Sequence, residues 1–135
     1  MTWDRFEDRK MKNCPVFAVT LAFSQGHSLN CYLTFNQRIR EQLLPGHPYC
    51  DLFLDRAGKR LGMRFLREPA DIHSYKVANY NGKAKSSARL SATAMVRAWR
   101  LTPPYWPYSY RAELKGDPRE GVWSFSIAPL MKTPV

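Results

Sequence analysis

Apolar and polar residues follow one another in the same order twice along this chain. In residues 28–66, an alternating apolar stretch leads into a short helix with a polar start, a Pro-Gly turn and two further alternating strands. Residues 86–127 repeat that order, with a longer proline-rich loop after the helix. A repeated order of this kind is typical of supersecondary units that bury their apolar faces against each other. We therefore predict two ββαββ repeats, 15–68 and 72–128, that share one core.

The elements of each repeat follow from residue periodicity and turn chemistry. Period-2 alternation bounded by Gly, Pro, Asn or Asp predicts strands, and Asn36 is a suitable helix N-cap because its side chain can accept from first-turn amides. Pro45-Gly46 is expected to end that helix. The first repeat has predicted strands at 15–23, 28–35, 49–54 and 60–66 and a helix at 36–44. The second has predicted strands at 75–80, 87–91, 109–114 and 122–128 and a helix at 93–101.

The two repeats can be aligned position by position. Few residues are identical, so the alignment depends on the order of polar starts, apolar periods and turns. The aligned positions are Val19 with Val77, Leu33 with Leu90, Ile39 with Val96, Leu44 with Leu101, Leu52 with Ala112, Leu61 with Trp123 and Met63 with Phe125.

Composition limits the class of protein. The 135 residues are 44% hydrophobic and 13% aromatic, which favours one folded domain, 15–135, preceded by a charged leader, 1–14. Three cysteines, all in the first half, do not make a disulfide framework. The N-terminus is too charged for a signal peptide, and no apolar run approaches the length of a membrane span. We expect a cytoplasmic protein that does not enter a membrane.

The chain is strongly basic. It has 21 Lys and Arg against 11 Asp and Glu, a formal net charge of +10. Such an excess favours association with polyanions, nucleic acid first. A basic soluble protein with no polyanion partner remains the alternative on charge alone.

The segment LTFNQRIREQLLPGHPYCDLFLDRAGKRLGMRF carries a resemblance to a known family. It resembles the AbrB/MazE/SpoVT swapped-hairpin family in its strand, small polar residue, "IR..L", Pro-Gly turn and strand pair, and LSATAMVRAWRLTPPY is similar in the second repeat. The resemblance implies a mostly β fold with two short helices, a pseudo-two-fold swapped-hairpin β-barrel made by one chain. It also implies a transcriptional regulator without cofactor that presents arginines to double-stranded DNA. The chain would be a monomeric pseudo-dimer or a homodimer.

Basic residues concentrate where such a protein would bind DNA. They surround the Asn81-Gly82 turn and lie on the two predicted helices, and in a pseudo-dimer these segments would approach one another to form one basic face. Lys and Arg there would contact phosphates and guanine edges. The candidate nucleic-acid-binding residues are Arg38, Arg40, Lys76, Lys83, Lys85, Arg89, Arg97 and Arg100.

The proline-rich segment 102–108 allows a second function. Tyr105, Trp106 and Tyr108 either close one end of the core or form an exposed anchor for a protein partner. In the second case the chain is a phage or mobile-element accessory protein that modulates a host protein. A MazE-type antitoxin is a third possibility, although only residues 129–135 follow the last predicted strand.

Enzymatic chemistry has little support in the sequence. His47 and Cys50 have ligand-like spacing, but no second pair of ligands is evident near Cys31 or His27. Phosphate-binding glycine loops and hydrolase motifs do not occur. We predict no catalytic residue, no metal site and no cofactor.

Overall fold

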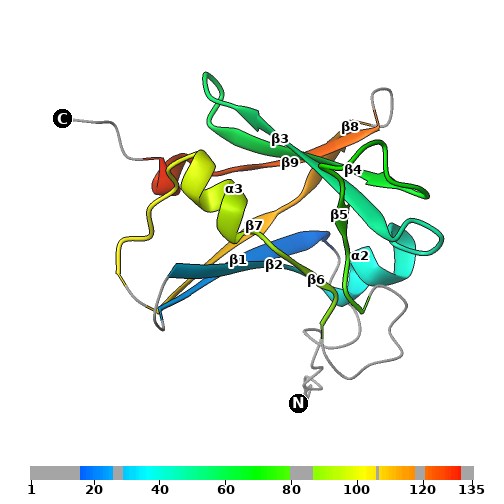
Figure 1. Cartoon of the computed structure of the whole chain (residues 1–135), viewed down its shortest axis with the longest axis horizontal. Coiled ribbons are helices and arrows are strands. Elements are labelled where there is room, and N and C mark those ends of the chain that lie inside the picture. Colours follow the sequence, from blue (N-terminus) through cyan, green and yellow to red (C-terminus); the bar gives the residue numbers. More distant parts are fainter. Residues whose placement is uncertain (1–15, 26–28, 80–86, 106, 118–120, 132–135) are drawn as a thin grey trace, which may run out of the picture.

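A computed structural model of the 135-residue chain describes residues 16–25, 29–79, 87–105, 107–117 and 121–131. The predicted leader, 1–14, lies outside these residues. The described residues are mostly β with two short helices, as predicted, and the strands form two antiparallel sheets (Figure 1). The four-stranded sheet has the order β6 (Arg89–Ser91), β2 (Leu29–Phe35), β1 (Ala18–Gln25) and β7 (Tyr108–Glu113). The five-stranded sheet has the order β5 (Tyr75–Lys76), β3 (Tyr49–Asp55), β4 (Arg60–Leu66), β9 (Val122–Ser126) and β8 (Lys115–Asp117).

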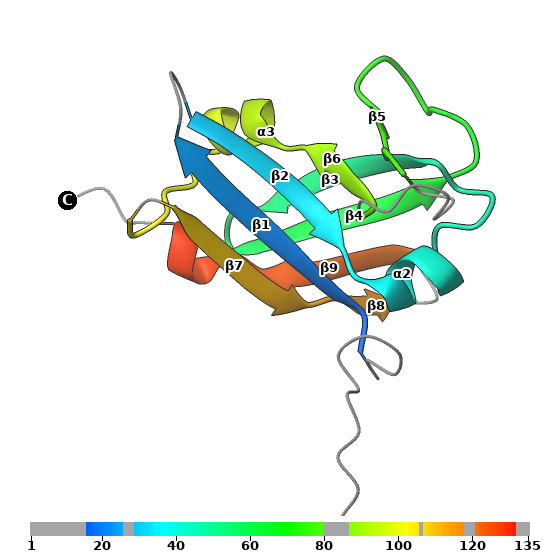
Figure 2. The same cartoon turned by 90° about the horizontal axis from the view of Figure 1, so that it is seen from below.

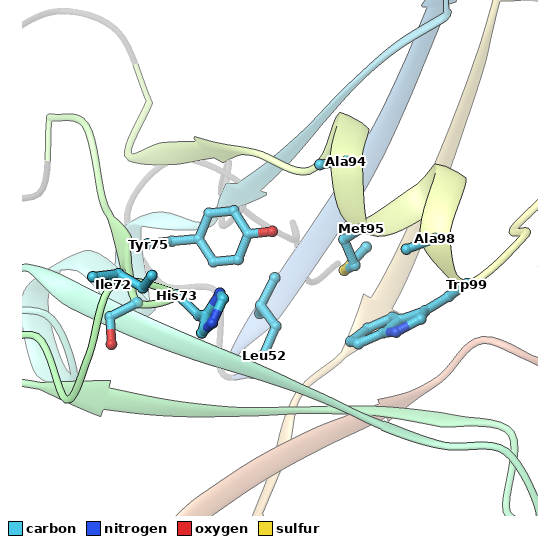
Figure 3. A pocket seen from close by; sticks show the side chains of 9 residues that line it. Leu52, Ile72, His73, Tyr75, Ala94, Met95, Ala98 and Trp99 are labelled. Carbon is cyan, nitrogen blue, oxygen red and sulfur yellow. The ribbon is translucent and has the colours of Figure 1, made fainter.

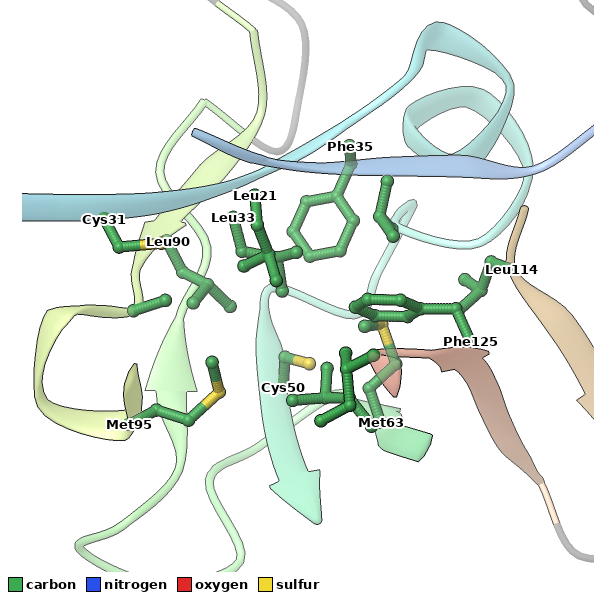
Figure 4. Close-up of a cluster of buried hydrophobic side chains, with 14 of the residues drawn as sticks. Leu21, Cys31, Leu33, Phe35, Cys50, Met63, Leu90, Met95, Leu114 and Phe125 are labelled. Carbon is green, nitrogen blue, oxygen red and sulfur yellow. The ribbon is translucent and has the colours of Figure 1, made fainter. Parts of the chain in front are cut away.

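The two sheets stack face to face and enclose the core (Figure 2). Alternation places Val19, Leu21 and Phe23 of β1 on the inner face, where each is buried. Across the interior, Phe35 meets Phe65 edge to face, with ring centroids 5.7 Å apart. Figure 4 shows the inner residues of both sheets meeting in one cluster. The halves of the chain therefore share a core, as the short join between them predicted.

The two helices lie at opposite ends of β2. Helix α2 (Gln37–Gln42) follows β2 directly, and Asn36 Oδ1 accepts from the backbone N–H of Ile39 at 3.1 Å, which confirms the predicted N-cap. Helix α3 (Thr93–Ala98) has no side-chain cap; Thr93 Oγ1 instead accepts from the N–H of Cys31, near the start of β2, at 3.0 Å. Figures 1 and 2 both show the helices apart. Neither helix in the described part of the chain has the length and apolar character needed to cross a bilayer.

The second half departs from its predicted strands. Strand β5 has two residues rather than six. Its ladder with β3 ends at Lys76, Ala78 forms a bridge with Arg89 of β6 instead, and Asn79 then adopts a left-handed backbone, φ 59°. The predicted turn after Leu114 begins instead with strand β8. The last strand ends at Ser126 and a 3₁₀ turn, Ala128–Leu130, follows.

The predicted closed barrel is not found among the described strands, and the two sheets stay separate. On one side β5 and β6 meet only through the isolated bridge between Ala78 and Arg89, because β5 is too short for a ladder. On the other side β7 and β9 are joined by a side chain. The Tyr110 hydroxyl donates to the carbonyl of Ser126 at 2.5 Å.

Candidate nucleic-acid interface

Six of the eight predicted DNA-binding residues lie in the described part of the chain. The other two, Lys83 and Lys85, fall outside it. The six separate into two groups, because α2 and α3 lie at opposite ends of β2. Arg38, Arg40, Lys76 and Arg89 belong to the end that carries α2, and Arg97 and Arg100 belong to the end that carries α3. The expected single face containing both helices is therefore not what the chain forms.

Backbone pairing brings α2, β5 and β6 together. Arg89 exchanges both backbone hydrogen bonds with Ala78, at 2.8 and 3.0 Å, and Lys76 lies opposite Tyr49 in the ladder between β5 and β3. The N–H of Phe35, just before α2, donates to the carbonyl of Ala88 at 2.9 Å. We call Arg40, Lys76 and Arg89 the β5–β6 basic edge. Lys76 and Arg89 are exposed and Arg40 is half-buried.

Arg89 is held by an aromatic ring. Its guanidinium lies over Tyr32, 4.5 Å from the ring centroid, on the outer face of the four-stranded sheet. Such cation–π contacts stabilise by about 0.5–1 kcal/mol at exposed sites. Tyr32 itself remains 39% exposed. Sequence reasoning missed Tyr32, although strand alternation with buried Cys31 and Leu33 would have turned it outward.

Arg38 faces the body of the protein. Its guanidinium lies 5.1 Å from the centroid of the Phe17 ring, and Phe17 in turn meets Trp123 edge to face at 5.1 Å. The Nε of Arg38 is buried and has no hydrogen-bond partner among the described residues. This predicted DNA contact therefore packs α2 onto the start of β1, and the cation–π contact is its main described interaction.

The second basic group follows the end of α3. Arg97 lies in the last turn of that helix and Arg100 just after it, both exposed. Arg100 has a left-handed backbone, φ 54°, which reverses the chain where the helix ends. These two side chains form a separate positive region at the other end of the molecule.

The aromatic segment lies at the same end as α3. Tyr105 is 64% exposed and its ring meets that of Tyr108 edge to face, with centroids 5.1 Å apart. Tyr108 also lies beside Phe23, at 6.4 Å, and is half-buried. Trp106 falls outside the described residues. Tyr108 thus closes the core, whereas Tyr105 is available to solvent.

The two cysteines in the described part of the chain are packing residues. Cys31 and Cys50 are fully buried. Burial raises the pKa of the Cys31 thiol to about 12, and burial together with the charge of Asp51 raises the pKa of Cys50 further. Such thiols stay protonated at neutral pH and are poor nucleophiles. His47 Nδ1 lies 2.9 Å from the carbonyl oxygen of Pro45, within its own turn.

Metal coordination has no support in the residues described. No group of three or more His, Cys, Asp or Glu side chains among them comes together.

Comparison with known proteins yields no relative. No protein-family model, no curated protein and no solved structure matches the chain.

Proposed function

We propose that this protein is a fused pair of AbrB/MazE/SpoVT-like swapped-hairpin units that binds double-stranded DNA through its β5–β6 basic edge. The observation that carries the fold part of the proposal is the ladder between β2 and β6, in which Leu33 lies opposite Leu90. Two copies of one strand that pair antiparallel about a two-fold axis must place one residue opposite its own counterpart. Leu33 and Leu90 are the counterparts that the alignment of the repeats predicts.

The hydrogen bonds around this pair support the same symmetry. Exchanging the two halves converts the bond from Phe35 N–H to the Ala88 carbonyl, 2.9 Å, into the bond from Ala92 N–H to the Cys31 carbonyl, 2.8 Å. The hydrogen bonds at the C-terminal ends of α2 and α3 also correspond under this symmetry. The bond from Leu44 N–H to the Ile39 carbonyl, 3.1 Å, has its counterpart between Leu101 and Val96, at 3.0 Å.

A second ladder, between β4 and β9, obeys the same rule. Gly62 lies opposite Ser124, and the flanking pairs are Leu61 with Phe125 and Met63 with Trp123. In the repeat alignment Leu61 corresponds to Trp123 and Met63 to Phe125. The two-fold operation therefore turns the pair Leu61–Phe125 into the pair Met63–Trp123, and the ladder is unchanged. The interleaving of strands from both halves in both sheets is the feature that a swapped-hairpin dimer has. Here a single chain would supply both partners.

The pairings adjust the alignment of the outer strands. Leu21 lies opposite Tyr110, whereas the N–H of Val77 donates to the carbonyl of Pro48 at 2.8 Å. In the β2–β6 ladder Arg89 is the counterpart of Tyr32; Arg89 bridges Ala78, and Tyr32 lies opposite Ala22. Under this symmetry Ala78 is the counterpart of Ala22, and Val77 is thus the counterpart of Leu21 rather than of Val19. Both residues are fully buried, so apolar character alone does not distinguish the two choices.

The DNA part of the proposal is supported by charge and exposure. The net charge is +10, Lys76 and Arg89 are exposed on segments that the bridge between Ala78 and Arg89 brings together, and Arg40 is half-buried on helix α2. Lys and Arg that contact phosphates release counterions, which gives affinity without sequence selectivity. Arg97 is the counterpart of Arg40, but Tyr32 is the counterpart of Arg89. The two ends therefore differ, and the bound DNA site is expected to be asymmetric.

The test is a salt series. Binding of a fluorescent DNA duplex to the full chain is measured by anisotropy at increasing ionic strength. With three phosphate contacts, the logarithm of the association constant should fall against the logarithm of salt concentration with a slope of about −2.7. A flat dependence would contradict phosphate-driven binding. A control duplex of scrambled sequence measures how much of the affinity is selective.

A second candidate function is favoured by the exposed ring of Tyr105. Tyrosine is a frequent anchor of protein interfaces, and this ring stands 64% exposed beside Tyr108. In this alternative the chain acts on a protein of a host cell. Capture from host lysate with and without nuclease separates the candidates. A protein retained after nuclease treatment and lost with Tyr105→Ala supports the second function.

A further inference from the structure

A hollow of about 480 Å³ opens between α3 and the segment that leads into β5 (Figure 3). Tyr75 and His73 line one side, Trp99 lines the other, and Leu52 of β3 lies between them. Ala94 and Ala98 of α3 also face it, one helical turn apart, and their short side chains leave the space unfilled. The volume falls within the range of small-molecule sites, which are lined mainly by apolar and aromatic side chains.

The walls combine apolar side chains with a few polar ones and carry no ionic side chain. None of the nine lining residues is Lys, Arg, Asp or Glu. Ser74 is already engaged, because its hydroxyl donates to Asp51 and accepts from the N–H of Ala70 at 3.0 Å. The described side chains with hydrogen-bonding groups that remain are those of His73, Tyr75 and Trp99. A buried ligand portion here must therefore be uncharged, because a charge would find no ionic partner in the walls.

The equivalent position beside α2, in the first half of the chain, is occupied by side chains. Under the symmetry proposed above, His73 is the counterpart of Phe17 and Met95 is the counterpart of Arg38. In the first half the Phe17 ring and the Arg38 guanidinium stack at 5.1 Å beneath α2. In the second half His73 is exposed and Met95 is buried, so the ring–guanidinium stack of the first half has no equivalent among the described residues there. This comparison depends on the proposed duplication, whereas the volume and the lining do not.

We propose that the hollow binds a planar, uncharged aromatic small molecule, with its ring against the indole of Trp99. Ile72, which is 93% exposed, stands at the rim and would cover part of the bound ring. The site is distinct from the β5–β6 basic edge, since its lining residues include none of Arg40, Lys76 and Arg89.

The experiment is an NMR titration of the ¹⁵N-labelled full chain with indole as the probe. The expected result is a saturable shift of the Trp99 indole N–H and of the Ser74 and Ala98 amides, with the Trp99 signal assigned through Trp99→Phe. Ala98→Phe fills the hollow and should weaken indole binding at least tenfold. Ala57→Phe, in the exposed turn between β3 and β4, is the matched control and should leave binding unchanged.

Two results would overturn the proposal. One is the absence of a saturable shift at these groups up to the solubility limit of indole. The other is equal binding of cyclohexanol, which would mean that the hollow takes any apolar group rather than an aromatic ring. If Ala98→Phe loses its dispersed spectrum, Ala94→Phe fills the same hollow from the neighbouring helical turn. Ala98→Phe should retain DNA affinity, so failure of this site and failure of the proposed function are separable.

Discussion

Leu33 lies directly opposite Leu90 in the ladder between β2 and β6, and both side chains point into the core, 0% and 3% exposed. They come from different halves of the chain, so this contact joins the two halves where the edge strand β6 pairs with β2 in the four-stranded sheet. Its burial makes it the most direct place to test whether the halves form one cooperative unit.

Leu33→Ala should lower the free energy of unfolding by about 2–5 kcal/mol, the range for buried leucine truncations. Urea unfolding of the variant and of the wild type measures this change in the free energy of unfolding. Ile72→Ala is the control, because a 93% exposed side chain should change stability by less than about 0.5 kcal/mol. In the double variant Leu33→Ala/Leu90→Ala the two losses should not add, because the residues are in contact. Strictly additive losses would mean that the pair does not couple the halves.

Asn36→Ala should cost about 1 kcal/mol, because the Ile39 N–H loses its acceptor at the start of α2. Asn36→Asp keeps the acceptor for the Ile39 N–H but loses the Nδ2 donor to the Val16 carbonyl, 2.9 Å, so it should recover only part of the stability. Gln37→Ala is the control, because Gln37 is the exposed neighbour of Asn36 and does not cap the helix. Thermal unfolding of the three variants ranks them, and equal losses for Asn36→Ala and Gln37→Ala would argue against the cap.

Tyr110→Phe removes the hydroxyl that joins β7 to β9 and leaves the Ser126 carbonyl without that donor. The expected loss is about 0.5–1.5 kcal/mol, the net value of one hydrogen bond. Tyr105→Phe removes the same atom from an exposed ring and should have no measurable effect. Denaturant midpoints that move equally in both variants would show that the hydroxyl of Tyr110 does not connect the sheets.

Stability should fall as pH rises above about 9. Burial raises the pKa of Cys31 from 9.0 to about 12, so the unfolded chain loses this proton first. Because the folded state then binds more protons than the unfolded state, the free energy of unfolding decreases with pH over that interval and is fully retained below it. Cys50 acts in the same direction. Cys31→Ala/Cys50→Ala should flatten the decrease, whereas a slope unchanged from wild type would contradict it.

Charge reversal should locate the DNA contact. Arg40→Glu/Lys76→Glu/Arg89→Glu should weaken duplex binding at least tenfold at moderate salt, because three phosphate contacts become repulsive. The matched control reverses the same number of charges elsewhere, at Arg56, Lys59 and Lys115, all exposed. Circular dichroism verifies that both variants fold. Equal losses in the two variants would mean that net charge, rather than the β5–β6 basic edge, drives binding.

The first half of the fold was predictable because its signals are local. Strands β1 to β4 and helix α2 follow from alternation and turn residues, and Asn36 caps the helix as its side-chain chemistry requires. The second half was predicted less well. Strand β5 ends at Lys76, where pairing passes from β3 to the bridge between Ala78 and Arg89, and that partner lies too far along the chain for local signals to indicate it.

The candidate site was predictable only in part. Net charge and the choice of basic residues follow from composition, but their distribution in space does not. The sequence suggested one face, and the separation of α2 from α3 makes two. Arg38 and Arg40 illustrate the difference. They lie on the same short helix, yet Arg38 stacks on Phe17 because of where β1 begins.

The amino-acid sequence by itself determined strands β1 to β4, the two helices and which face of those strands is apolar, because these features depend on neighbouring residues. It also determined the repeat of element order and the excess of positive charge. Tertiary structure alone decided that β1 pairs with β7 and β4 with β9, that the sheets stay separate, and that a hollow opens beside Trp99. Those features depend on contacts between residues far apart in the chain. Several strands have similar apolar patterns, and only the packing of the whole core decides which of them pair.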